Sequence, residues 1–148
     1  MIALSCVSSD ESHNDKLMEI VNSYRKQIFS SLEEKDSLFY TIVFFETDST
    51  RNVLVTANDV ELSGFMVTPS SKKPSKDPFI GYSKYNNNFL FYYSVQDCDF
   101  YDYYVDESCL KKKIDDKNLL RYNTNDWNID TPIWIYIVNE DYTLRKDK

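Results

Sequence analysis

The chain has 148 residues, of which 42% are hydrophobic and 28% are charged, and its formal net charge is -7. This is the size and composition of one folded domain. The sequence contains no apolar run near the roughly 20 residues that a membrane-spanning helix needs, and its acidity disfavours nucleic acid, which is bound by clustered Lys and Arg. With two glycines and one histidine, it excludes glycine-rich phosphate loops, Ser-His-Asp and Cys-His catalysis, and histidine-rich metal sites.

Residues 1–13 are expected to be a polar tail or tether ahead of a single domain over 14–148. The run Met-Ile-Ala-Leu-Ser-Cys that ends at Cys6 resembles the end of a bacterial lipoprotein signal, in which a small residue precedes a lipidated cysteine. The resemblance implies a lipid on Cys6 and attachment to the cell envelope. A full signal also needs a basic segment and roughly 7–15 apolar residues. Two interpretations therefore stay open: an envelope lipoprotein with a truncated start, or a chance match in a cytoplasmic protein.

The other two cysteines, Cys98 and Cys109, form an even pair if Cys6 carries a lipid. In an exported protein we expect them to bridge, with Cα atoms within about 7 Å of each other. In a reducing cytosol, all three cysteines are expected to be free thiols.

Residues 14–35 are predicted to form one amphipathic helix, which Ser12 or Asn14 can cap. Its apolar residues recur at steps of three and four, as in a helix with one buried face: Leu17, Ile20, Val21, Tyr24, Ile28 and Leu32. Strongly patterned strands follow directly. We therefore expect this stripe to pack on the protein's own sheet.

The remaining segments predict an antiparallel β-sheet of five or more strands, and hence an α+β fold. The strands are expected over residues 38–46, 51–57, 65–68, 79–85, 89–95 and 131–138, with 142–145 pairing back. The first is apolar on both faces and is expected to be central, and residues 86–88 supply a hairpin turn. The helix is expected to pack against Ile42, Phe44, Val53, Val55, Ile133 and Ile135.

Residues 96–107, called here the acidic tyrosine segment, alternate acids with aromatic rings and contain no base. The acids are Asp97, Asp99, Asp102, Asp106 and Glu107, and the rings are Phe100, Tyr101, Tyr103 and Tyr104. Calcium is disfavoured because the spacing does not match an EF-hand loop and no glycine is present. The segment is expected either to bind a basic protein surface through its carboxylates and Tyr101, Tyr103 and Tyr104, or to be a solvated loop anchored by its rings.

Short helical turns are expected over residues 106–121, with Asp106 as a cap and with Glu107 and Lys111 as an i,i+4 ion pair.

The missing catalytic groups, the charge and the acidic tyrosine segment favour a non-enzymatic protein-binding domain, of the acidic inhibitor or immunity type, with a basic protein surface as its partner. The envelope lipoprotein is the first alternative. The second is a hydrolase that uses a carboxylate pair, such as Asp102 with Asp106 or Glu46 with Asp48. The sequence indicates no cofactor and no metal.

Overall fold

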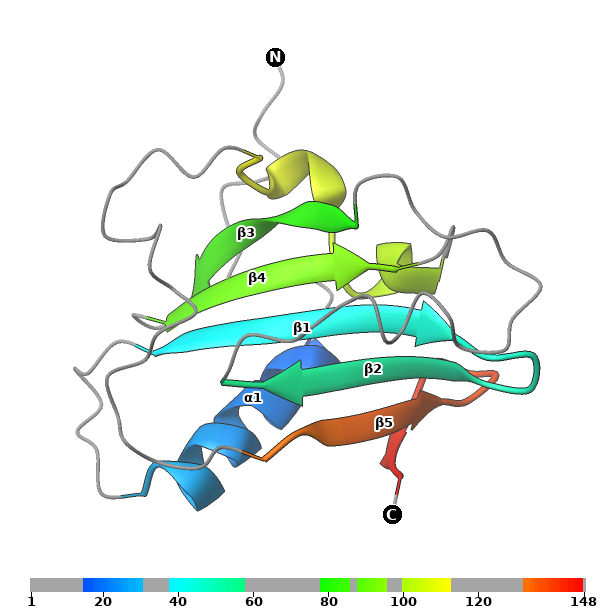
Figure 1. Ribbon diagram of the computed structural model, residues 1–148, viewed down its shortest axis with the longest axis horizontal. Coiled ribbons are helices and arrows are strands. Elements are labelled where there is room, and N and C mark those ends of the chain that lie inside the picture. Colours follow the sequence, from blue (N-terminus) through cyan, green and yellow to red (C-terminus); the bar gives the residue numbers. More distant parts are fainter. Residues whose placement is uncertain are drawn as a thin grey trace.

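A computed structural model describes residues 15–30, 38–57, 78–85, 88–95, 100–112 and 132–147. Its elements, in chain order, are α1 (Asp15–Ile28), β1 (Phe39–Glu46), β2 (Arg51–Thr56), β3 (Phe79–Tyr85), β4 (Asn88–Ser94), the 3-10 helices η3 (Phe100–Tyr103) and η4 (Glu107–Cys109), β5 (Trp134–Val138) and β6 (Leu144–Lys146). One helix lies on one face of a β-sheet (Figure 1). The predicted α+β fold is therefore confirmed. The predicted strand over 65–68 and most of the turn over 86–88 lie outside the described residues.

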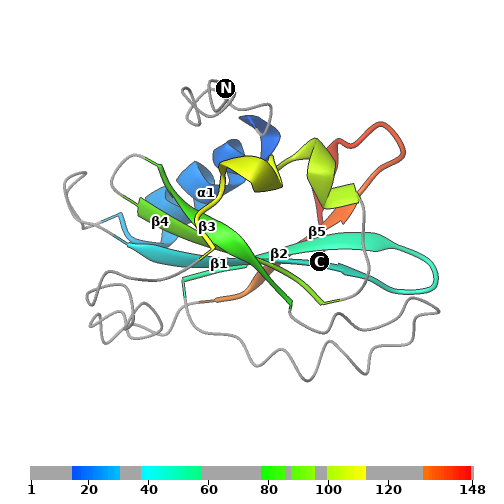
Figure 2. The same cartoon turned by 90° about the horizontal axis from the view of Figure 1, so that it is seen from above.

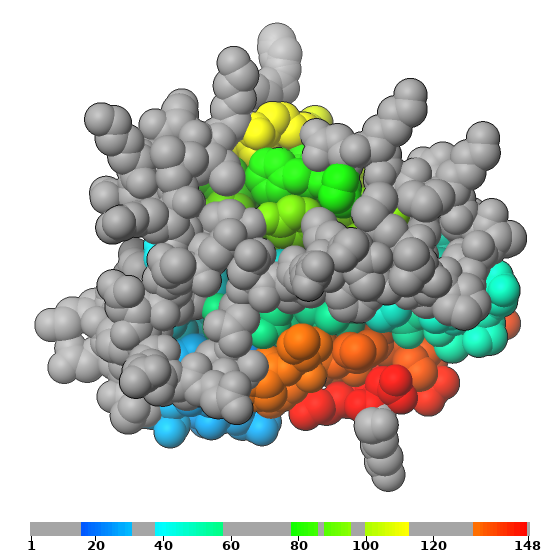
Figure 3. Space-filling view, viewed as in Figure 1, coloured from blue at the N-terminus to red at the C-terminus, as the bar shows by residue number. Residues whose placement is uncertain are grey.

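The described strands form one six-stranded sheet in the order β3-β4-β1-β2-β5-β6. β1 lies inside the sheet, and its six inner residues are buried, as two apolar faces predict. Four of the five strand pairs are antiparallel, whereas β1 and β4 run parallel. The parallel pair joins the β3–β4 hairpin to the edge of β1 that β2 does not occupy. In the space-filling view, β3 and β4 (green) therefore lie towards one side of the molecule, and β5 and β6 (orange and red) towards the other (Figure 3). The sheet is thus mostly antiparallel, and this one pair differs from the prediction.

α1 packs its apolar stripe against the middle of the sheet. Leu17, Val21 and Tyr24 are fully buried, Ile20 is buried, and Ile28 is partly buried against the same core. The sheet contributes Tyr40, Ile42 and Phe44 from β1, Val53 and Val55 from β2, and Leu90 and Tyr92 from β4. α1 ends at Ile28 rather than at residue 35. The poor helix former Ser30 follows, and Leu32 lies outside the described residues.

β5 presents the opposite face from the predicted one. Trp134, Tyr136 and Val138 join the core under α1, whereas Ile135 packs against the cluster on the other face, and Ile133 is 53% exposed. Both alternating sets of β5 are apolar, so hydrophobicity alone does not choose between them. The register decides: Tyr136 lies opposite Val53 and Trp134 opposite Val55, and residues paired across two strands share a face.

The hydroxyl of Tyr24 fixes α1 to two strands at once. It donates a hydrogen bond to the carbonyl of Pro132 at 2.5 Å, just before β5, and accepts one from the amide of Ala57 at 3.3 Å, just after β2. The ring lies 5.0 Å from the ring of Trp134 and 6.0 Å from that of Tyr40, between centroids. Tyr24 therefore holds α1 on the sheet both by the packing of its ring and by the two hydrogen bonds of its hydroxyl.

Two matched substitutions test which isoleucines form the core. Ile42→Ala removes a fully buried side chain, and we expect it to lower the free energy of unfolding by about 2–5 kcal/mol. Ile133→Ala is expected to change it by less than about 0.5 kcal/mol because the side chain is exposed. Urea denaturation measures both. A large loss for Ile133→Ala would show that the face predicted from the sequence is the buried one.

Candidate functional site

The described part of the acidic tyrosine segment lies on the same side of the sheet as α1 (Figure 2). Phe100 and Tyr104 are buried in the core under α1. The ring of Phe44 in β1 meets that of Phe100 edge to face at 5.8 Å and stacks on that of Tyr104 at 6.3 Å. Tyr101 is partly buried against the same core, with its ring 5.8 Å from that of Phe44. Three of the four rings therefore anchor the segment to the sheet.

Tyr103, which is exposed, and Tyr142, which is half-buried, form the outer part of this region. Their rings stack at 4.3 Å with an interplanar angle of 9°. The ammonium of Lys16 lies 5.2 Å from the Tyr103 ring, and the guanidinium of Arg51 lies 4.9 Å from the Tyr142 ring. These four side chains, called here the tyrosine column, join α1, β2, η3 and the β5–β6 turn. Each ring thus contacts one cation, the other ring of the pair and the ring of Tyr104, whose centroid lies 5.1 Å from that of Tyr103 and 6.4 Å from that of Tyr142. Cations and rings are both favourable neighbours of an aromatic ring.

The backbone of Tyr142 is strained and is held from below. Its φ of 67° lies in the left-handed region, which costs a non-glycine residue roughly 1–2 kcal/mol. The buried hydroxyl of Tyr104 donates a hydrogen bond of 2.6 Å to the carbonyl of Tyr142, and burial raises the pKa of Tyr104, so this donor stays protonated. The conformation of the column is therefore set by the core beneath it.

The carboxylates of the segment have different roles. Asp102 is exposed. Asp106 caps η4, as predicted, and accepts hydrogen bonds from the amide and hydroxyl of Ser108 at 3.1 and 2.6 Å. Glu107 accepts one from the hydroxyl of Tyr101 at 2.7 Å. Asp97 and Asp99 lie outside the described residues.

The ion pair of Glu107 differs from the predicted one. Its partner is Lys112, at 2.6 Å, and not Lys111. η4 spans only Glu107–Cys109, so the i,i+4 geometry of a longer helix does not apply, and the backbone of Lys111 instead pairs with Tyr82 in β3. Hydrogen bonds from Lys112 and Tyr101 lower the pKa of Glu107.

Sequence inspection did not identify Lys16, Arg51 or Tyr142 as members of this site. They lie far from residues 96–107 in the chain, and α1, β2 and the β5–β6 turn bring them there. Glu140 and Asp141 join them in the same turn, and both are exposed. Hydrogen bonds from Thr143 lower the pKa of Asp141. No local signal in the sequence could have indicated this grouping.

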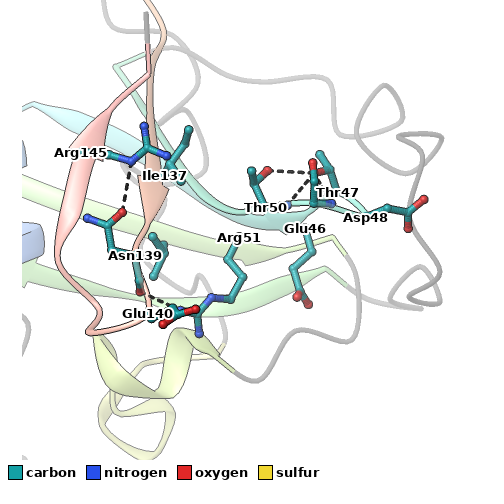
Figure 4. A pocket seen from close by; sticks show the side chains of 11 residues that line it. Glu46, Thr47, Asp48, Thr50, Arg51, Ile137, Asn139, Glu140 and Arg145 are labelled. Atoms are coloured by element: carbon teal, nitrogen blue, oxygen red, sulfur yellow. Dashed lines mark hydrogen bonds between the residues drawn. The ribbon is translucent and has the colours of Figure 1, made fainter.

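A pocket of about 440 Å³ lies between the β1–β2 turn and the β5–β6 turn (Figure 4). Its charged lining residues are Glu46, Asp48, Glu140, Arg51 and Arg145. Glu46 and Asp48, one of the two carboxylate pairs considered for hydrolysis, therefore share this pocket. The other pair does not share a comparable position, because Asp106 is a helix cap and Asp102 is exposed.

Within the described ranges, no three His, Cys, Asp or Glu side chains are grouped as metal ligands, and no helix there is long and apolar enough to span a membrane. Cys109 is part of a disulfide. The other two cysteines, Cys6 and Cys98, lie outside the described residues, so the predicted pairing of Cys98 with Cys109 stays a prediction.

Comparisons with protein-family models, with curated proteins and with solved structures find no match to this chain. Function is therefore inferred from the residues themselves.

The ion pair of Glu107 gives a prediction about pH. A lowered pKa in the folded state stabilises the fold at neutral pH, and this contribution is lost as the pH falls from the ordinary glutamate value through the lowered one. We expect Lys112→Ala to raise the pKa of Glu107 towards its ordinary value, measured by NMR titration of the side-chain carboxyl. Lys111→Ala is the matched control and should leave the pKa of Glu107 unchanged. An equal rise in this variant would show that Glu107 pairs with Lys111, as predicted from the sequence.

Proposed function

We propose that this chain is a non-enzymatic protein-binding domain that recognises a basic surface on another protein. The observation that carries the proposal is the stacked pair of Tyr103 and Tyr142 at the surface. Tyr103 is 40% exposed, and it and Ile133 are the only exposed large hydrophobic residues in the described part of the chain. Tyrosine is enriched at binding hot spots because it brings a large rigid contact area and a polar tip.

The rigidity of the tyrosine column supports this proposal. Binding costs free energy when side chains must be ordered on contact. Here Lys16 lies against Tyr103 and donates a hydrogen bond of 3.4 Å to its hydroxyl, the guanidinium of Arg51 lies against the Tyr142 ring, and the hydroxyl of Tyr104 holds the backbone of Tyr142. A strained residue that is kept in place by its surroundings is typical of functional positions.

The charges around the tyrosine column favour a basic partner. Asp102 precedes Tyr103 in η3, and Glu140 and Asp141 precede Tyr142 in the β5–β6 turn; all three acids are exposed. The whole chain carries a formal net charge of -7. Complementary charge speeds association and discriminates between partners more than it adds affinity. The tyrosines would then contribute most of the binding energy, and the carboxylates most of the steering.

The proposal is tested with a protein that the immobilised domain captures and that mass spectrometry identifies. Tyr103→Ala is expected to weaken binding by about 30-fold, as for a residue that contributes about 2 kcal/mol, mainly through faster dissociation in surface plasmon resonance. Asp102→Lys is expected to slow association and to reduce its dependence on salt.

Ile133→Ala is the control, because it truncates the other exposed large hydrophobic residue in the described ranges, which lies just before β5 and is not part of the tyrosine column. Tyr104→Ala is unsuitable, since this side chain is fully buried and its loss would unsettle the core. A partner that binds Tyr103→Ala as tightly as the wild type, while Asp102→Lys has no effect on association, would overturn the proposal.

One observation favours a second candidate, a domain that works outside the reducing cytosol as an envelope lipoprotein. The disulfide at Cys109 is of a kind that persists in oxidising compartments. Under this candidate Cys6 carries the lipid, which leaves Cys98 as the partner of Cys109.

Peptide mapping without reduction tests this second candidate on protein purified from its native host. We expect a cross-linked peptide that joins Cys98 to Cys109, with a lipid mass on Cys6. A bond between Cys6 and Cys109 would exclude the lipid, and free thiols at all three cysteines would place the protein in a reducing compartment.

A further inference from the structure

We propose that the pocket between the β1–β2 turn and the β5–β6 turn is a binding site for a small zwitterion, of the class of free amino acids and short peptides. The pocket lies where the β1–β2 hairpin and the β5–β6 hairpin end, and residues of both turns line it (Figure 4). This inference is argued from other observations than the proposed protein-binding surface, although Arg51 and Glu140 belong to both. It rests on the size of the pocket, on the arrangement of its charges and on the residues that hold them.

The size and lining of the pocket select a small polar ligand. A volume of about 440 Å³ is within the roughly 300–1,000 Å³ of ordinary ligand pockets. Ile137 and Val138 are the only apolar residues in its lining, and Val138 is buried in the core, whereas Thr47, Ser49 and Thr50 carry hydroxyls. A drug-like apolar molecule would find little surface to bury here. A molecule the size of a dipeptide fits and can use the hydroxyls.

The β5–β6 turn orients a guanidinium towards the pocket. The Nε of Arg145 donates a hydrogen bond of 3.1 Å to Oδ1 of Asn139. The amide nitrogen of Asn139 in turn donates to Oγ1 of Thr143 at 2.9 Å, and that hydroxyl donates to Asp141 at 2.6 Å. This chain of bonds leaves the two terminal nitrogens of Arg145 without a hydrogen bond to any other described residue. An oriented guanidinium fork matches the geometry of a carboxylate.

Carboxylates lie on the other side of the pocket. Figure 4 shows that Glu46 and Glu140 point to the side on which Arg51 lies, away from Arg145. Arg51 keeps its positive charge on this side, but its guanidinium is held away from a ligand: its Nη2 donates to the carbonyl of Asn139 at 2.8 Å, and the group lies over the ring of Tyr142. Glu140 is exposed and forms no ion pair with a residue in the described ranges. An ammonium group would find acceptors on this side.

The separation of the charges is what selects a zwitterion. A simple anion would be attracted by Arg145 but repelled by the carboxylates of Glu46, Asp48 and Glu140. A simple cation would be attracted by these carboxylates but repelled by Arg145. A molecule that carries both an ammonium and a carboxylate satisfies both sides, because like-charge contacts disfavour the wrong ligand as strongly as opposite charges favour the right one.

Three glycyl-glycine ligands that differ in their end groups, together with glycine, test the charge requirement. Gly-Gly carries both charges, acetyl-Gly-Gly only the negative one, Gly-Gly-amide only the positive one, and glycine is the shortest zwitterion. Binding is followed by NMR shifts of the backbone amides of residues 47–50 and 139–140. We expect Gly-Gly to bind at least about five-fold more tightly than either singly charged analogue. The ratio of glycine to Gly-Gly then separates free amino acids from peptides as the ligand.

Two variants test whether Arg145 binds the carboxylate of the ligand and whether Glu140 binds its ammonium group. Arg145→Gln is expected to abolish the preference for Gly-Gly over Gly-Gly-amide, and Glu140→Gln the preference over acetyl-Gly-Gly. Lys146→Gln is the control for the first, because this neighbouring cation lies 3.7 Å from the Trp134 ring and does not line the pocket; Glu19→Gln, on an exposed position of α1, is the control for the second.

The proposal is overturned if a singly charged analogue binds as tightly as Gly-Gly, if the control variants change binding as much as Arg145→Gln and Glu140→Gln do, or if no ligand shifts these amides at its highest soluble concentration. Unchanged thermal midpoints of the variants show that each remains folded. A loss of protein binding by Tyr103→Ala has no bearing on these titrations, so the two proposals can fail separately.

Discussion

The arrangement of the whole domain depends on one constraint, which is that β1 is apolar on both of its faces. A strand of this kind must be covered on two sides and hydrogen-bonded along two edges. β2 occupies one edge and the β3–β4 hairpin the other. On one face, Tyr40, Ile42 and Phe44 meet α1 and the rings of the acidic tyrosine segment. On the other, Val43 and Phe45 belong to a second cluster, with Leu54 and Val95. The position of the candidate site follows, because Phe44 is the surface on which Phe100 and Tyr104 stack.

The features that the sequence predicts correctly are those with a local period. The stripe of α1, the first two strands, the strands of the β3–β4 hairpin and the cap at Asp106 all depend on residues within a few positions of one another. The buried face of β5 and the ion-pair partner of Glu107 do not depend on such local patterns. β5 is apolar on both sides, so only its register with β2 decides which side meets the helix, and the partner of Glu107 depends on where η4 ends. The tyrosine column cannot be predicted from any local pattern, since its four members come from four separate elements.

The tyrosine column shows how a surface can be rigid without being apolar. Exposed rings in water gain little from one another unless both are held, and free rotation of two tyrosines would oppose stacking. Here each ring contacts a cation and two other rings, and the strained backbone of Tyr142 is bonded to a buried hydroxyl. The stability of the core therefore supports a local conformation that is unfavourable by itself. This is the arrangement expected where shape at the surface matters more than local stability.

The β5–β6 turn belongs to both proposed sites, which raises the question of whether they are coupled. The carbonyl of Asn139 accepts from Arg51 of the tyrosine column, and its side chain accepts from Arg145 of the pocket. Coupling between sites requires an element with two arrangements whose balance each ligand shifts. The polar groups of this turn are bonded in one arrangement: the amide of Asn139 donates to the carbonyl of Thr143, that of Tyr142 donates to the carbonyl of Asn139, and Asp141 accepts from Thr143. A second arrangement would have to break several of these bonds together and also release Tyr142 from Tyr104. The turn therefore acts as a rigid support shared by two surfaces. Coupling between the two surfaces would then come from the charges of Arg51 and Glu140, which belong to both, and not from a change in the shape of the turn.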